Sequence, residues 1–163
     1  MLATDMLVKR FEHNHSINTR LLDLATKLTP DQWNDPSVTY SRGDIHNILY
    51  HIIRVEQGWL YFCEHGKRNP DLPTIEAFPT AESLQTYCEE VHATSYAFVS
   101  NLDDAGLNST VMAKSTDGTE DPLIIWHILT HVLYHSGQHQ SEAAELLTRY
   151  GQSPGDIDFI YFV

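Results

Sequence analysis

The sequence predicts an all-α protein built as a four-helix bundle. Four long segments carry apolar residues at three-and-four spacing, which is the repeat of a helix with one buried face. No strong strand run and no internal repeat interrupt this pattern. At 163 residues, of which 42% are hydrophobic, the chain fits one domain, residues 1–163, with a sizeable core.

The first long helix is expected over residues 4 to about 28, with Thr4 as its N-cap. A short turn or helix should follow, because Thr29 can cap it and Pro30 suits the first helical position. The residues that recur at helical spacing along the first helix are Leu7, Phe11, Asn14, Asn18, Leu21, Leu22 and Ala25.

The second long helix is expected over residues 42 to about 65. Ser41 and Asp44 mark its entrance, and Gly66 is a fitting stop. Glu56 lies near the centre of its apolar face, where a carboxylate needs a partner such as a metal ligand's second nitrogen or a cation. The stripe that must pack inward is Ile45, Ile48, Leu49, Ile52, Val55, Trp59 and Cys63.

The third long helix should start after Thr80, which can cap it, and continue to about Asn101. Helical periodicity is lost between residues 103 and 120. The segments 110–112 and 117–119 suggest a short hairpin or an irregular loop there.

The fourth long helix is expected to open at Asp121 and Pro122 and to end at Gly151. Residues 156–163 then form a tail dense in Ile, Phe and Tyr. Because such a tail is too apolar to lie free in water, we expect it to pack on the bundle or on a second subunit.

The composition excludes several classes of function. The formal net charge is −12, so binding to nucleic acid or to anionic membranes is not expected without a concentrated basic face. No apolar run reaches transmembrane length, and the N-terminus lacks a basic region followed by an apolar core, so we expect a cytoplasmic protein. The two cysteines, Cys63 and Cys88, provide no disulfide framework.

Histidines at one repeating interval distinguish the fourth helix: His127, His131, His135 and His139. Residues four apart are neighbours on one helical face, so two such imidazoles can close on one ion. Each four-residue step also climbs about 6 Å, so only adjacent histidines can share a small ion. Four histidines in register on an apolar segment favour a metal or catalytic role over ordinary histidines of a half-buried helix.

The spacing alone leaves three adjacent pairs possible, and it favours the middle pair only weakly. His131 and His135 lie within or at the end of the apolar run 123–134, where an imidazole needs a partner. His139 lies in polar sequence and is expected to be a solvated side chain.

The chain resembles the DinB/YfiT-like superfamily of metalloenzymes, small bundles with an up-down-down-up arrangement. The likeness covers nearly the whole chain. The residues that carry it are Asn18 with Leu21 and Leu22, His51 with Glu56 and Trp59, His131 with His135 and Gln138, Gly151, and Asp158 with Phe159 and Ile160.

The resemblance implies that His51, His131 and His135 hold a divalent metal ion. Three imidazoles leave a coordination position open, which is typical of a catalytic site. Zinc is the first choice, and nickel, cobalt, manganese and iron also accept imidazole ligands. The family often has an arginine just after the final ligand, where this chain has Ser136, so a role of that arginine in holding an anionic substrate does not carry over.

Relatives in this superfamily include S-transferases that use low-molecular-weight thiols such as bacillithiol or mycothiol. The resemblance therefore implies an enzyme whose metal activates a thiol that attacks a small-molecule substrate. The alternatives are a metal-dependent hydrolase, with Glu56 or His127 as proton acceptor, and a non-catalytic metal-binding protein of a stress response. The apolar tail and the habit of the family also predict a homodimer.

Overall fold

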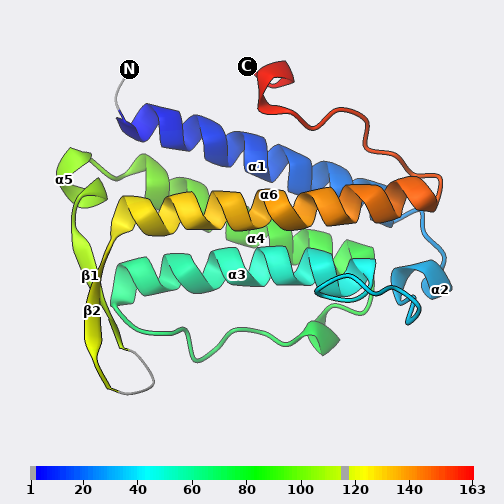
Figure 1. Cartoon of the computed structure of the whole chain (residues 1–163), viewed down its shortest axis with the longest axis horizontal. Coiled ribbons are helices and arrows are strands. Elements are labelled where there is room, and N and C mark those ends of the chain that lie inside the picture. Colours follow the sequence, from blue (N-terminus) through cyan, green and yellow to red (C-terminus); the bar gives the residue numbers. More distant parts are fainter. Residues whose placement is uncertain (1–2, 115–117) are drawn as a thin grey trace.

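The computed structural model describes residues 3–114 and 118–163. Its four long helices, α1 (Ala3–Ala25), α3 (Ile45–His65), α4 (Ala81–Ser100) and α6 (Ile125–Arg149), form a bundle (Figure 1). The helices α1 and α6 run in one direction, and α3 and α4 run in the other. Both α1 and α3 pack against α4 and α6, so α1 and α3 lie diagonally opposite each other. The predicted all-α bundle with an up-down-down-up arrangement is confirmed.

Capping residues explain where most of the helices begin and end. Thr29 forms a capping box with Gln32 at the start of α2 (Pro30–Trp33), and Thr80 forms one with Ser83 at the start of α4. The side chain of Asp44 accepts from the backbone of Asn47, so α3 begins three residues later than expected. At its other end Gly66 adopts a φ of 64°, a conformation that glycine takes without steric cost.

The predicted start of the fourth long helix was wrong by three residues, since α6 begins at Ile125 and not at Pro122. Between α5 (Asp104–Leu107) and α6, the chain forms an antiparallel hairpin of β1 (Thr110–Lys114) and β2 (Glu120–Ile124). Pro122 lies opposite Met112 in this hairpin instead of opening a helix. A two-stranded hairpin has only edge strands, where proline is tolerated. Of the predicted turn 117–119, residue 117 lies outside the described residues.

The N-cap expected at Thr4 was also wrong, because Thr4 lies inside α1. Its hydroxyl donates instead to the carbonyl of Leu102, 3.0 Å away, and so ties α1 to the end of α4. The helix then ends at Ala25, earlier than expected.

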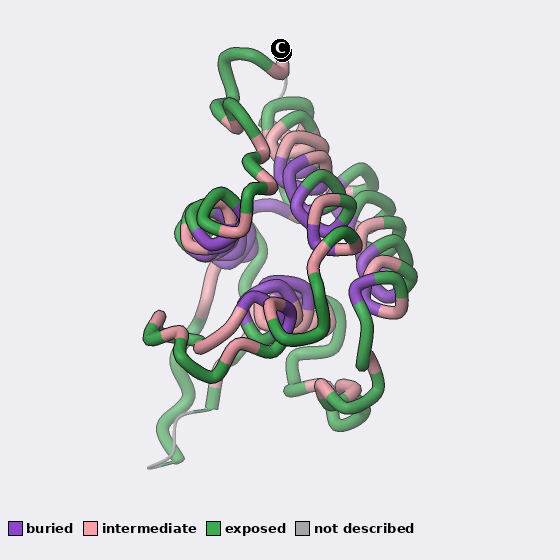
Figure 2. Tube along the Cα trace, turned by 90° about the vertical axis from the view of Figure 1, so that its right-hand side faces the viewer, coloured by how far each residue is buried: buried purple, intermediate pink, exposed green. Residues whose placement is uncertain are grey.

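The bundle interior consists of two apolar clusters separated by a polar layer. One cluster surrounds Leu21, Ile48 and Leu147, and the other surrounds Phe11 and Leu129. In Figure 2 the buried stretches of the helices face this common interior. On each helix, buried or half-buried polar residues separate the two clusters. These residues are Asn14, His15 and Asn18 on α1, Glu56 on α3, His92 and Ser95 on α4, and Ser136, His139 and Gln140 on α6.

The apolar tail packs along α1, as one of the two expectations had it. The His13 ring lies 5.2 Å from that of Phe159 and 5.3 Å from that of Phe162, between ring centroids. Ile160 and Tyr161 nevertheless remain 69% and 72% exposed. The tail therefore adds an apolar outer surface beside α1. Within the described ranges, no helix is both long and apolar enough to cross a membrane.

Candidate metal centre

Three histidines converge between α3 and α6, namely His51, His135 and His139. One ring nitrogen of each lies within 4.8 Å of the others. The Nε2 atoms of His51 and His135 are 3.0 Å apart. Two nitrogens bound to one zinc ion at about 2.0–2.1 Å in tetrahedral geometry lie roughly 3.3 Å apart. His51 and His135 are therefore already close to the separation that a common divalent ion requires, and His139 lies near enough to be a third ligand.

The packing of two antiparallel helices brings these side chains together. His135 and His139 are one turn apart on α6, so their rings share a face, with centroids 4.6 Å apart. His51 projects from α3, and its ring lies 4.8 Å from that of His135 and 4.9 Å from that of His139. The third ligand thus comes from a facing helix, as is usual for metal sites in helical bundles.

The imidazoles of His51 and His135 are neutral at physiological pH. Burial, with a further contribution from the positive charge of Arg42, lowers the pKa of His51 to about 3. Burial and the neighbouring histidines lower the pKa of His135 to about 4. A histidine must be neutral to offer a lone pair to a metal, so both side chains are in the form that binding requires.

Glu142 orients the third imidazole. Its Oε2 atom lies 2.6 Å from Nδ1 of His139, whose side chain is almost fully buried. A carboxylate on Nδ1 fixes the hydrogen there and leaves Nε2 free for a metal. Such carboxylate–histidine pairs commonly support metal ligands.

The converging set differs from the predicted set in one member. His139 replaces His131, which is exposed and packs its ring against Trp59 at 5.5 Å. Because α3 and α6 run antiparallel, His131 lies opposite Trp59, about two turns along α3 from His51, whereas the ring of His139 lies 4.9 Å from that of His51. The expectation that His139 is solvated was wrong, since it is only 3% exposed. The polar sequence that follows His139 includes Glu142, whose carboxylate contacts the buried imidazole.

Glu56 is fully buried but belongs to the polar layer. Its Oε1 atom lies 2.8 Å from Nε2 of His15, and it accepts hydrogen bonds from Asn14 and Ser95. Burial by itself raises the pKa of Glu56, but its hydrogen bonds and the nearby histidines outweigh burial and lower it. Glu56 is therefore a carboxylate held by α1 and α4, and it does not join the three histidines.

A second group with donor atoms close enough to share an ion consists of His15, Glu56 and His92. The two imidazoles are stacked, with centroids 3.8 Å apart and an interplanar angle of 13°. Imidazole lone pairs lie in the ring plane, so stacked rings direct them side by side and not toward one point. The hydrogen bonds of Glu56 hold α1, α3 and α4 together, which is a structural role. The three histidines between α3 and α6 are therefore the better candidate for a metal site.

The remaining candidates lie apart from the centre. His127 is exposed, and its ring packs edge-on against Trp126 at 4.0 Å. His127 lies two turns from His135 and does not contact the cluster. Glu56 does not contact the cluster either, because its carboxylate is bound in the polar layer. Ser136, at the position where an arginine was expected by resemblance, is buried, and its hydroxyl has no hydrogen-bond partner among the described residues.

Two features of the centre were not foreseen. The supporting role of Glu142 has a signal in the sequence, because a carboxylate three residues after a histidine lies on the same helical face. The polar layer has a weaker signal, since its partners are spread over all four helices.

Comparison with known proteins identifies the family of the chain. A model of the DinB family matches residues 1–163, the whole length of the chain. A search of the curated proteins gives no match. With a helical bundle and a three-histidine group between its second and last long helices, the chain belongs to the DinB family.

Proposed function

We propose that this protein is a divalent-metal-dependent enzyme whose ligands are His51, His135 and His139. The convergence of these three imidazoles from α3 and α6 is the observation that supports the proposal most directly. Three histidines without a fourth protein ligand suit a catalytic site, because structural zinc sites are closed by four. Zinc is the first choice, with nickel, cobalt, manganese and iron as further candidates.

When bound, such an ion would lower the pKa of a thiol or a water molecule that reaches it. By its family, the protein is proposed to be an S-transferase that joins a low-molecular-weight thiol to an electrophilic small molecule. The chain itself supplies neutral imidazoles, a carboxylate that orients one of them, and an exposed histidine, His131, one turn from His135. His131 is better placed than Glu56 or His127 to take up a proton at the open side.

Metal analysis of untagged protein and four single variants tests the ligand set. His51→Ala, His135→Ala and His139→Ala should each lose the metal, whereas His131→Ala should retain it. If His131→Ala lost the metal and His139→Ala retained it, the ligands would be His51, His131 and His135, as the family resemblance implies. Retention in all four variants would show that the metal does not bind here.

Metal-loaded protein incubated with a cellular thiol and an electrophile tests the reaction class. Conjugation that disappears in His135→Ala is the expected result. Ester or amide cleavage without conjugation would favour a metal-dependent hydrolase that uses the same centre.

A non-catalytic metal-binding role is the second candidate function. It is favoured by the position of Glu56 and His127, neither of which lies at the three-histidine cluster. This candidate predicts full metal content without turnover of any thiol or ester substrate.

A further inference from the structure

A groove of about 720 Å³ opens along the C-terminal half of α3, and its lining begins at Arg54, three residues after His51. It lies between the C-terminal half of α3, the loop after α3 and the β1–β2 hairpin. In Figure 1 that loop passes along α3, and the hairpin lies at the same end of the bundle. A volume of this size falls in the range of small-molecule sites, roughly 300–1,000 Å³.

The groove concentrates positive charge on an acidic protein. Four of the ten Lys and Arg residues line it, namely Arg54, Lys67, Arg68 and Lys114. Glu120 is the one acidic residue among the described residues of its lining. None of the four cations forms an ion pair with another residue in ranges 3–114 and 118–163. In a chain of net charge −12, this groove is where an anion would be attracted.

The rest of the lining is largely apolar. Val55, Trp59 and Phe62 contribute from α3, Leu72 from the loop, and Met112 from β1. Met112 is 46% exposed, although large apolar side chains are usually covered. An occupant that matches this lining has an apolar body as well as a negative group.

Two residues of the α3 lining, Val55 and Trp59, connect the groove to the histidines. Val55 lies one helical turn from His51, so the two side chains share a face. Trp59, one turn further, lines the groove, and its ring contacts that of His131. Arg54, three residues after His51 on α3, also lies on this side of the helix and lines the groove.

We propose that this groove binds the substrate of the three-histidine centre, and that this substrate is an amphipathic organic anion. The cations hold its carboxylate, phosphate or sulfonate group, and the apolar side chains hold its body, with the reactive end directed to the histidines. The substrate assignment rests on the proposed function, whereas the anion-binding property of the groove does not. A small molecule is favoured over an acidic protein segment because the groove leads to a candidate reactive centre.

Fluorescence titration of metal-free protein with 8-anilinonaphthalene-1-sulfonate tests the groove. N-phenyl-1-naphthylamine has the same aromatic body without the sulfonate and is the matched probe. The double variant Arg54→Gln/Arg68→Gln should weaken sulfonate binding about tenfold or more, which is the expected loss of charge-assisted contacts. Binding of the uncharged probe should change little.

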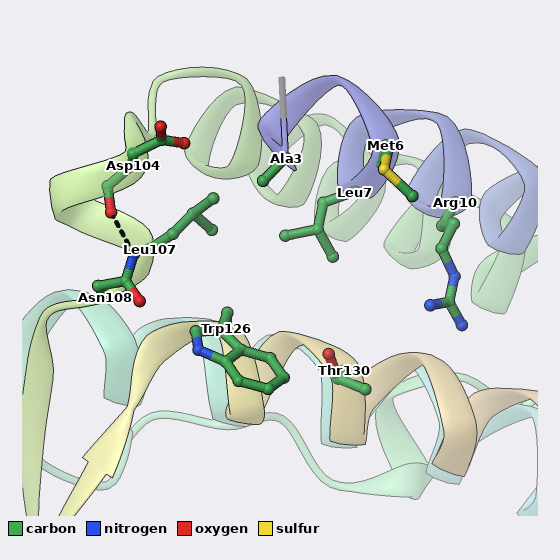
Figure 3. Close-up of a pocket in the computed structure, with 9 residues that line it drawn as sticks. All are labelled: Ala3, Met6, Leu7, Arg10, Asp104, Leu107, Asn108, Trp126 and Thr130. Carbon is green, nitrogen blue, oxygen red and sulfur yellow. Dashed lines mark hydrogen bonds between the residues drawn. The ribbon is translucent and has the colours of Figure 1, made fainter. Parts of the chain in front are cut away.

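A second pocket supplies the control variant. Leu7 and Arg10 of α1 point toward Trp126 and Thr130 of α6 there, around a space of about 320 Å³ (Figure 3). Lys9→Gln/Arg10→Gln removes the charge of Arg10 in this second pocket and that of Lys9, which pairs with Glu12 outside both pockets, and should leave sulfonate binding within about twofold. An equal or larger loss in this control, or parallel loss of the uncharged probe, would overturn the proposal. Circular dichroism of both variants would confirm that they fold.

Two further measurements separate the groove from the metal centre and from a protein partner. Cobalt(II) bound to the histidines should change its visible spectrum when the sulfonate probe is added, and Arg54→Gln/Arg68→Gln should abolish the change. If cobalt does not bind, the proposed function fails while the titration still decides the groove. Tighter binding of a fluorescent poly-glutamate peptide than of the sulfonate probe would overturn the small-molecule occupant.

Discussion

Glu142 places Oε2 2.6 Å from Nδ1 of His139, and both residues are on one face of α6. This contact makes Glu142 a positioning residue for the third imidazole of the candidate centre. Glu142→Ala should weaken metal binding by about 10- to 100-fold, the usual loss when a carboxylate partner of a histidine ligand is removed. Competition with a chromogenic chelator measures the change.

The conservative variant and a matched control sharpen this prediction. Glu142→Gln should recover part of the affinity, because its amide oxygen can still accept from Nδ1. Glu145→Ala removes a carboxylate that pairs with Arg149 on the exposed side of α6 and should leave metal affinity unchanged. Equal losses in both alanine variants would contradict the positioning role.

The metal-free protein should become less stable as the pH falls below 6.5. The pKa values of His51 and His135 are lowered from 6.5 to about 3 and about 4. The unfolded chain therefore binds protons between pH 6.5 and about 4 that the folded chain does not, so the free energy of unfolding falls through this window. Above pH 6.5 the two histidines are neutral in both states and contribute no slope.

Urea unfolding at pH 7.5 and pH 5 measures this dependence. His51→Ala should show a smaller loss of stability between the two values than the parent chain. His127→Ala, which removes an exposed histidine of α6, is the control and should show the parent's dependence. If His51→Ala left the pH dependence of the free energy of unfolding unchanged, the lowered pKa of His51 would be contradicted.

His15, in the polar layer, should contribute to stability without serving as a metal ligand. His15→Leu leaves the carboxylate of Glu56 buried without its histidine partner and should cost about 3–5 kcal/mol. The double variant His15→Leu/Glu56→Leu should cost less than the sum of the single variants, because it leaves no unpaired charge.

Chemical unfolding and metal analysis together test this prediction. His15→Leu, which keeps the hydrogen bond between Glu56 and Asn14, should retain the metal content of the parent chain. Loss of metal in His15→Leu with native stability would instead identify the His15, Glu56 and His92 group as the metal site.

The exposed tail predicts a homodimer. Ile160 and Tyr161 present apolar surface beside α1, and such surface is commonly covered by a partner. Light scattering should give the mass of a dimer at micromolar concentration, and Ile160→Ser/Tyr161→Ser should shift the mass toward that of a monomer. A monomeric parent chain would refute the prediction.

Much of the fold could be predicted from the sequence because its signals are local. Thr29, Asp44 and Thr80 cap the next segment through their own side chains, and Gly66 ends α3 through its own backbone. The start of α6 could not be read in this way. Pro122 fits a helix start and an edge strand equally well, and only the pairing of β2 with β1 decides between them.

The candidate site was harder to predict because the spacing of histidines on one helix does not determine which of them lie beside a neighbouring helix. The histidine interval identified the correct face of α6 but not which pair meets His51. That choice depends on how α3 crosses α6, a tertiary property. Family resemblance supplied His131, whereas the structure brings His139 to His51 and His135.

The polar layer between the two apolar clusters has a consequence for how the helices align along the bundle axis. Apolar side chains tolerate sliding, but the hydrogen bonds of Glu56, Asn14 and Gln140 are satisfied at one axial alignment only. The layer therefore fixes the axial position of α3 relative to α6, and with it the distance between His51 and His135. Replacing Asn14, Glu56 and Gln140 together with leucines is expected to preserve a helical, stable protein in which His51 no longer lies within reach of His135.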